Sequence, residues 1–189
     1  MNKIILMALF ICLNTFAKNV TITIESKPIA LVDEKFLSFG VDTAQVVGSF
    51  WWDAKGEMNG GRGKNKTTPL KLTSPKLLEY AKELSPAYFR IGGSEADALF
   101  YNLGSNDKAY PEKFDSVLTK SRFKKIKNFI KYTGLDLFFT LNQGPPTWKD
   151  GKWQTDHLDH FFKYYSKNLD IPITFELGNE VFAYWAIFA

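Results

Sequence analysis

The chain has 189 residues, of which 45% are hydrophobic and 16% aromatic, so it can bury the core of about one domain and is not a disordered chain. Its formal net charge of +4 is too small to indicate nucleic-acid binding by itself. The single cysteine, Cys12, lies near the N-terminus, within a segment that the chain is expected to lose. The mature protein would then hold no cysteine for a disulfide or a metal site.

Residues 1–17 have the pattern of a secretory signal peptide. Lys3 precedes the apolar run "IILMALFICL", and Thr15 and Ala17 are small residues near the expected cleavage point. We therefore expect a protein that enters the secretory pathway and is extracellular, lysosomal or on the cell surface, with residues 18–189 as its domain. An uncleaved membrane anchor is the alternative, which the shortness of the run disfavours.

Strand-like and helix-like patterns alternate along the rest of the chain. Ser74 and Pro75 form a typical helix start, and the apolar residues of the second helical pattern fall on one side. In chain order the patterns predict a strand at Phe36–Asp42, a helix from Pro75 to about Leu84, a strand at Ala87–Gly92, a helix at about Arg122–Tyr132, a strand at Leu135–Asn142, a helix from about Asp156 to Leu169, and a strand at Ile173–Glu180. This alternation predicts an α/β fold with a parallel sheet.

The parity within each strand distinguishes two kinds of α/β architecture. In the first strand Leu37, Phe39 and Val41 alternate with polar or small residues, and the other strands repeat the pattern. A sheet with helices on both faces normally reads as apolar on both parities. Here one set of alternating residues is apolar and the other is largely polar. This pattern favours a (β/α)₈ barrel, whose polar interior residues gather toward the C-terminal rim.

The polar parity also places chemistry at the strand ends. Asp42, Asn142 and Glu180 stand at the C-terminal ends of different strands, where enzymes of this architecture carry their catalytic groups. A structural alternative is that Asp42 and Asn142 cap the turns that follow them. The same parity puts Arg90 and Glu176 inside the barrel, so each is expected to have a charge or hydrogen-bond partner there, the other being a candidate.

At these residues the chain resembles a known family. The stretches "SPKLLEYAKELSPAYFRIGGSEAD" (Ser74–Asp97), "GLDLFFTLN" (Gly134–Asn142) and "FELGNE" (Phe175–Glu180) resemble the N-terminal half of the catalytic domain in family-79 glycoside hydrolases, the heparanase family. The resemblance implies that the chain holds about four β/α units, the N-terminal half of a (β/α)₈ TIM barrel.

The resemblance also implies an activity and a site. It suggests a retaining hydrolase of β-glucuronide linkages in glycosaminoglycan-type polysaccharides such as heparan sulfate, which needs no metal or other cofactor. Glu180 matches the general acid/base and Asn179 its sugar-contacting neighbour, while Asp42, Ser94 and Asn142 match positions that line the sugar pocket.

The family's nucleophile lies on a later strand, so the chain is expected to be a fragment without it, with an open barrel edge suited to self-association. A non-catalytic, secreted glycan-binding or decoy protein of the same fold is the alternative function.

Overall fold

The computed structural model describes residues 21–24, 26–50, 58–59, 62–63, 65–168 and 170–187. The chain divides into two compact units, Met1–Val32 and Asp33–Ala189. The described residues of the first unit form no helix or strand, and the predicted signal peptide lies outside the described residues. All the elements below belong to the second unit.

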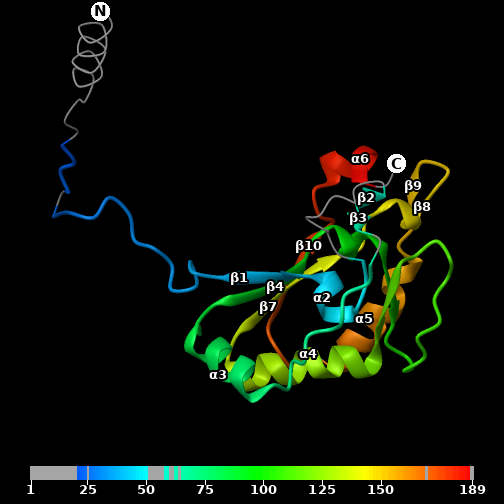
Figure 1. The fold of residues 1–189 in the computed structure, drawn as a ribbon, viewed down its shortest axis with the longest axis horizontal. Coiled ribbons are helices and arrows are strands. Elements are labelled where there is room, and N and C mark those ends of the chain that lie inside the picture. Colours follow the sequence, from blue (N-terminus) through cyan, green and yellow to red (C-terminus); the bar gives the residue numbers. More distant parts are fainter. Residues whose placement is uncertain are drawn as a thin grey trace, which may run out of the picture. The chain divides into compact units, whose positions relative to one another are not determined.

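A parallel sheet of four strands forms the centre of the second unit (Figure 1). Its strands lie in the order β1 (Phe39–Asp42), β4 (Tyr88–Gly92), β7 (Asp136–Leu141) and β10 (Ile173–Leu177). The register pairs Phe89 with Phe39 on one side and with Leu137 on the other. The predicted strands and the parallel α/β fold are confirmed.

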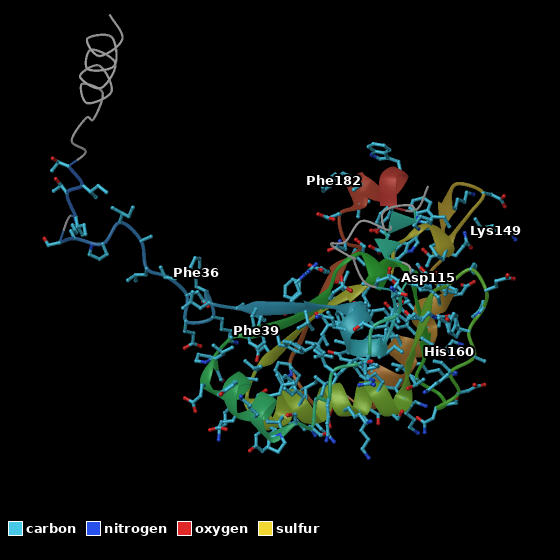
Figure 2. All side chains as sticks on the ribbon, in the orientation of Figure 1. Phe36, Phe39, Asp115, Lys149, His160 and Phe182 are labelled. Atoms are coloured by element: carbon cyan, nitrogen blue, oxygen red, sulfur yellow. The ribbon has the colours of Figure 1, made fainter. Side chains whose placement is uncertain are left out.

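All four strands are shorter than predicted, and β1 and β10 are the most shortened, for local reasons. Phe36 and Leu37 precede β1 and are 71% and 80% exposed, so no neighbouring layer stabilises them as strand. Figure 2 shows Phe36 on the chain segment that leads into β1. At the other end of the sheet, Gly178 has a φ of 66° and turns the backbone away directly after β10. Strands β1 and β10 are the two edges of this sheet, and self-association through an open edge stays a prediction.

Three helices connect the strands and confirm the helical patterns: α3 (Pro75–Glu83), α4 (Lys120–Thr133) and α5 (Asp156–Asn168). Helix α4 begins where the Thr119 hydroxyl accepts the Arg122 N–H, and it ends at the left-handed Gly134. The smaller elements are α2 (Thr43–Val47), β2 (Met58–Asn59), β3 (Arg62–Gly63), η1 (Ser94–Ala98), β5 (Leu99–Asn102), β6 (Ser116–Thr119), η2 (Pro145–Thr147), β8 (Trp148–Lys149), β9 (Lys152–Trp153), η3 (Val181–Ala183) and α6 (Tyr184–Ile187). None of the helices described has the length and apolarity that a bilayer span requires.

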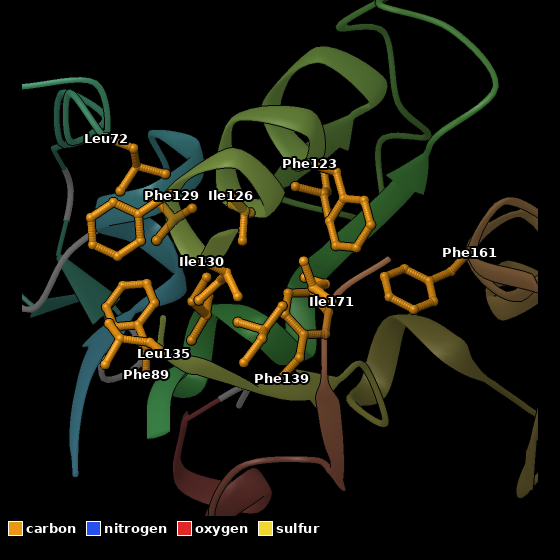
Figure 3. Packing of buried hydrophobic residues seen from close by; sticks show 14 of the residues in the cluster. Leu72, Phe89, Phe123, Ile126, Phe129, Ile130, Leu135, Phe139, Phe161 and Ile171 are labelled. Carbon is orange, nitrogen blue, oxygen red and sulfur yellow. The ribbon is translucent and has the colours of Figure 1, made fainter. Parts of the chain in front are cut away.

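The core lies between the sheet and these helices, and it uses the apolar strand parity (Figure 3). Phe89 and Phe139 of the sheet, Phe123 and Phe129 of α4, and Phe161 of α5 are each at most 2% exposed. Burying one such side chain contributes roughly 1.5–3 kcal/mol, so this cluster is the main source of stability.

One lysine departs from the amphipathic pattern of α4. Lys127 is only 8% exposed, although a lysine is expected on the polar side of an amphipathic helix. Its ammonium donates to the Asn168 carbonyl at 2.8 Å and pairs with Asp170 at 2.6 Å. The aliphatic stem therefore packs against the protein while the charge meets oxygen atoms at the end of α5.

Candidate active site at the strand ends

Because the four strands are parallel, their C-terminal ends lie together along one side of the sheet. Asp42 and Gly92 are paired residues at the ends of β1 and β4, and Leu177 is paired with Leu141 at the ends of β10 and β7. The turns that follow these strands therefore bring together residues far apart in the sequence. The predicted site residues lie at these C-terminal strand ends or in the turns that follow them.

A charged network crosses the polar face of the sheet beneath these strand ends. Arg90 donates from Nε to Glu176 Oε1 at 2.9 Å, makes a second, shorter bond to the same oxygen, and donates from Nη2 to Asn179 Oδ1 at 3.0 Å. The Thr140 hydroxyl also donates to Glu176 Oε1. The predicted pairing of Arg90 with Glu176 is confirmed, and through Arg90 it reaches the predicted sugar-contacting residue Asn179.

Asp97, in η1, is a central residue of the site that the sequence patterns did not single out. Its side chain is fully buried, its Oδ1 accepts the Gln143 N–H at 3.0 Å, and its Oδ2 accepts the Asn179 N–H at 2.7 Å. Burial raises the pKa of this carboxyl to about 6, although the bonds from Asn179, Gln143 and the Tyr184 hydroxyl oppose the shift. An acid within the quoted motif was visible, but its position in a buried turn was not.

Asp42 closes β1 and caps α2, as the structural alternative predicted. Its Oδ1 accepts the Ala44 N–H at 2.7 Å. Gly93 has a φ of 88°, and a Cβ there would lie 2.0 Å from Asp42 Oδ2, so the backbone approaches the second carboxylate oxygen closely. Burial raises the pKa of Asp42 to about 6, against the effects of the Ala44 bond and the positive charge of Arg90.

The two other predicted pocket residues are buried. Asn142 has no exposed surface; its amide donates to the Leu99 carbonyl at 2.9 Å, and its Oδ1 accepts the Gly144 N–H at 2.8 Å. Ser94, at the start of η1, is 3% exposed. In this structure the Asn142 side chain holds the turn after β7, which is the structural alternative stated for it.

Glu180 lies in the turn after β10, immediately beyond Asn179. It is exposed, with a φ of 45° in the left-handed region that few residues other than glycine adopt, and its carbonyl accepts the Ala183 N–H at 2.7 Å. The turn thus contains two left-handed residues, Gly178 and Glu180, with Asn179 held between them by Arg90 and Asp97.

His157 serves the fold next to this site. Its Nε2 lies 2.9 Å from the Asn142 carbonyl, its ring stacks on Tyr101, and burial lowers its pKa. Within the part of the chain that the structure describes, no cluster of three or more His, Cys, Asp or Glu residues could hold a metal ion.

Comparison with known proteins places these features in a family. The family model described as "Glycosyl hydrolase family 79, N-terminal domain" matches residues 18–186. A hyaluronoglucuronidase from Hirudo nipponia is 31% identical over 190 residues, which cover 86% of this chain and 36% of that protein. A heparanase from Mus musculus is 26% identical over 158 residues, 60% of this chain and 29% of that protein. The chain spans about a third of the length of these relatives. The predicted resemblance is confirmed, and the chain belongs to glycosyl hydrolase family 79, of which it carries the N-terminal domain.

Proposed function

We propose that this chain is part of a retaining glycoside hydrolase that cleaves glucuronide linkages in a glycosaminoglycan, with Glu180 as its general acid/base. The observation that carries the proposal is the anchoring of Asn179, directly before Glu180, by Arg90 of β4 and Asp97 of η1. This anchoring fixes the backbone from which the exposed Glu180 carboxyl extends at the strand ends. The names of the relatives, hyaluronoglucuronidase and heparanase, support a substrate such as hyaluronan or heparan sulfate.

The proposed fold of the whole catalytic domain is a (β/α)₈ barrel, of which the described sheet is the first half. Its strands are adjacent in the order in which they occur in the chain. Because parallel crossovers are right-handed, strands added in sequence put their helices on one face, as in a barrel. The burial of the apolar parity against α4 and α5 supports this architecture.

The proposed chemistry assigns each group a step. Glu180, protonated, gives its proton to the glycosidic oxygen as that bond breaks, and as a carboxylate it then takes a proton from the water that releases the sugar. A second carboxylate about 5–5.5 Å away attacks the anomeric carbon, and we assign it to a strand outside these 189 residues. The proposed sugar-pocket residues are Asn179, Asp42, Ser94 and Asn142, of which Ser94 and Asn142 are buried in this structure.

The proposed location follows from residues 1–17 and is tested separately. We propose that this segment is removed on secretion, so that the mature protein begins at Lys18. Mass spectrometry of protein from the medium of secreting cells would identify the N-terminus. Retention of residues 1–17 in a membrane fraction would support the uncleaved anchor instead.

The activity test compares lengths and variants. Lys18–Ala189 and a version extended to a complete barrel are assayed on an aryl β-glucuronide, hyaluronan and heparan sulfate. We expect turnover only from the extended version and its loss in Glu180→Gln. Asp150→Asn is the matched control, because Asp150 is also exposed and left-handed, with a φ of 51°, but lies in the β8–β9 turn. Turnover by the shorter protein would refute the need for a second half.

A second candidate function, glycan binding without catalysis, is favoured by a basic cavity. The cavity measures about 440 Å³ and lies beside the first turn of α4. Its basic lining residues are Lys66, Lys108, Arg122 and Lys125. Among the described residues, the Lys66 ammonium donates to two neutral oxygens, those of the Tyr110 hydroxyl and the Asp115 backbone.

Heparan sulfate binding by Lys18–Ala189 that weakens steeply with salt and in Lys125→Ala, without turnover by any version, would favour this function over hydrolysis.

A further inference from the structure

The carboxylate of Asp97 joins two turns that follow different strands. Gln143 lies just beyond β7 and Asn179 just beyond β10, and each gives its backbone N–H to a different oxygen of Asp97. The side chain is 0% exposed. The nearby acid Glu176 repels a charged Asp97 and does not stabilise it. The buried carboxylate is stabilised instead by the two backbone N–H donors and the Tyr184 hydroxyl.

Burying a carboxylate in this way is costly, and a neutral residue would avoid the cost. Two N–H donors on two separate oxygens explain why a carboxylate is needed here. An asparagine offers only one acceptor oxygen, and its amide nitrogen would face the second N–H donor. The geometry of the two turns therefore selects an acid at position 97.

The backbone around Asp97 is fitted to this contact. A Cβ on Gly144 would lie 2.0 Å from the Asp97 carbonyl oxygen and 2.6 Å from its Cβ. A side chain at position 144 would thus push η1 away from the turn after β7. The absence of a side chain at Gly144 is part of how Asp97 reaches Gln143.

The turn that Asp97 holds is strained. Glu180 keeps a left-handed conformation that costs a non-glycine residue of order 1–3 kcal/mol and persists only where surrounding contacts fix it. The Gly178 N–H donates to the Leu141 carbonyl at 3.0 Å, and Asn179 is fixed through both its backbone and its side chain. The Asp97 bond is the contact that acts on the backbone of the residue next to Glu180.

We infer that Asp97 is a positioning residue, which sets the direction of the Asn179–Glu180 turn relative to the Arg90–Glu176 pair by accepting two backbone N–H groups. Because its side chain is fully buried, Asp97 would act through the backbone of Asn179 and not by direct contact with a substrate. The role as part of an active site rests on the proposed function, whereas the anchoring itself does not.

The test follows the two amides by NMR. In ¹⁵N–¹H spectra of the chain between pH 4 and pH 8, the Gln143 and Asn179 amide resonances should shift together, with one midpoint near pH 6, the pKa of Asp97. The transition should be absent in Asp97→Asn. It should remain in Glu176→Gln, which removes the neighbouring acid, and in Asp42→Asn, whose carboxylate holds Ala44 instead. The pKa values of Tyr101 and Tyr184 are raised by burial, so these hydroxyls do not ionise in this range. His157 does titrate there and lies 2.9 Å from the Asn142 carbonyl, which shares a peptide group with the Gln143 N–H, so the titration is repeated in His157→Gln.

The His157→Gln spectrum, in which Asp97 is intact, decides the matter even if Asp97→Asn does not fold. Midpoints for Gln143 and Asn179 that differ in His157→Gln, or no transition in either, would overturn the inference, as would a shared transition that survives in Asp97→Asn. Because the amide signals do not depend on turnover, loss of the proposed hydrolase function would leave this result standing, and the reverse also holds.

Discussion

Arg90 and Glu176, 86 residues apart in the chain, form an ion pair across β7, the strand that separates theirs. Their side chains are 38% and 26% exposed, so the pair is neither a surface pair nor a fully buried one. Thr140 of the intervening strand donates to the same Glu176 oxygen. The pair therefore joins three strands on the polar face of the sheet.

The first prediction concerns the stability of this pair. Exposed pairs contribute about 0–1 kcal/mol, and removing one partner of a buried pair costs about 3–5 kcal/mol. Because solvent partly screens Arg90 and Glu176, we expect Glu176→Ala to lower the free energy of unfolding by about 2 kcal/mol. Urea unfolding of both single variants and of the double variant would give the coupling energy.

Lys131→Ala is the control for this cycle. Lys131 pairs with Asp170, but both side chains are at least 40% exposed and Asp170 keeps a second partner in Lys127. The loss in Lys131→Ala should stay below about 0.5 kcal/mol. Equal losses in Lys131→Ala and Glu176→Ala would show that the interior position of the Arg90 pair adds nothing.

Strand parity explains why this pair could be predicted from the sequence and why Asp97 could not. Arg90 and Glu176 lie inside regular strands, where alternation fixes the face on which each side chain stands. Asp97 lies in a short 3-10 turn, and its partners are backbone N–H groups, which carry no residue signature. The apolar side of α4 was predictable for the same periodic reason, whereas the burial of Lys127 depends on Asp170, beyond the end of α5.

The second prediction uses the raised pKa of Asp42, about 6 in the folded protein against about 3.9 in an unfolded chain. Between these values the folded state binds more protons, so this carboxyl contributes stability at low pH that is lost as the pH rises to about 6. We expect the stability of the wild type relative to Asp42→Asn to fall by about 2–3 kcal/mol between pH 4 and pH 7. Asparagine is also a good N-cap, so the variant removes the charge and keeps the cap of α2.

Urea unfolding of the two proteins at several pH values would measure this difference. A difference that is constant, or that grows as the pH rises, would contradict the burial of the Asp42 carboxyl as the dominant effect.

The third prediction has the opposite sign and concerns His157. Burial lowers its pKa in the folded protein, so below the unfolded value of about 6.5 the unfolded chain binds more protons. The stability that neutral His157 contributes is therefore present above pH 6.5 and is lost as the pH falls. Relative to His157→Gln, the wild type should lose stability from pH 7 to pH 5 in thermal or urea unfolding.

His160→Gln is the matched variant, because His160 lies on the same helix and is exposed. The comparison distinguishes the loss of the half-buried His157 and its contacts from the effect of replacing an exposed histidine on the same helix. A wild type that instead gains stability relative to His157→Gln on acidification would show that His157 is stabilised in its charged form.

The fourth prediction concerns Gly178, whose φ of 66° no other residue adopts easily. A Cβ at this position would also lie 2.5 Å from the Tyr184 hydroxyl oxygen and 2.9 Å from Val181 Cγ2. Gly178→Ala should therefore lower the free energy of unfolding by about 1–3 kcal/mol through backbone strain and crowding. Gly151→Ala isolates the backbone effect, since Gly151 has a φ of 70° but no atom within 4 Å of its ideal Cβ. Equal losses of stability in the two variants would mean that Tyr184 and Val181 move away from the added methyl group at no cost in free energy.

The last prediction separates stability from function at Glu180. In a helix, glycine is less stable than alanine by about 1 kcal/mol, but a left-handed residue reverses this order because glycine adopts positive φ without strain. Glu180→Gly should therefore be more stable than Glu180→Ala by about 1 kcal/mol, and Asp150 should show the same order. Lys124, exposed within α4, should show the opposite order. If Glu180 is the general acid/base, both Glu180 variants of a complete hydrolase lose turnover although the glycine variant is the more stable of the two, which separates the role in catalysis from the effect of backbone strain. An alanine variant as stable as the glycine variant would show that the turn relaxes once the glutamate is removed.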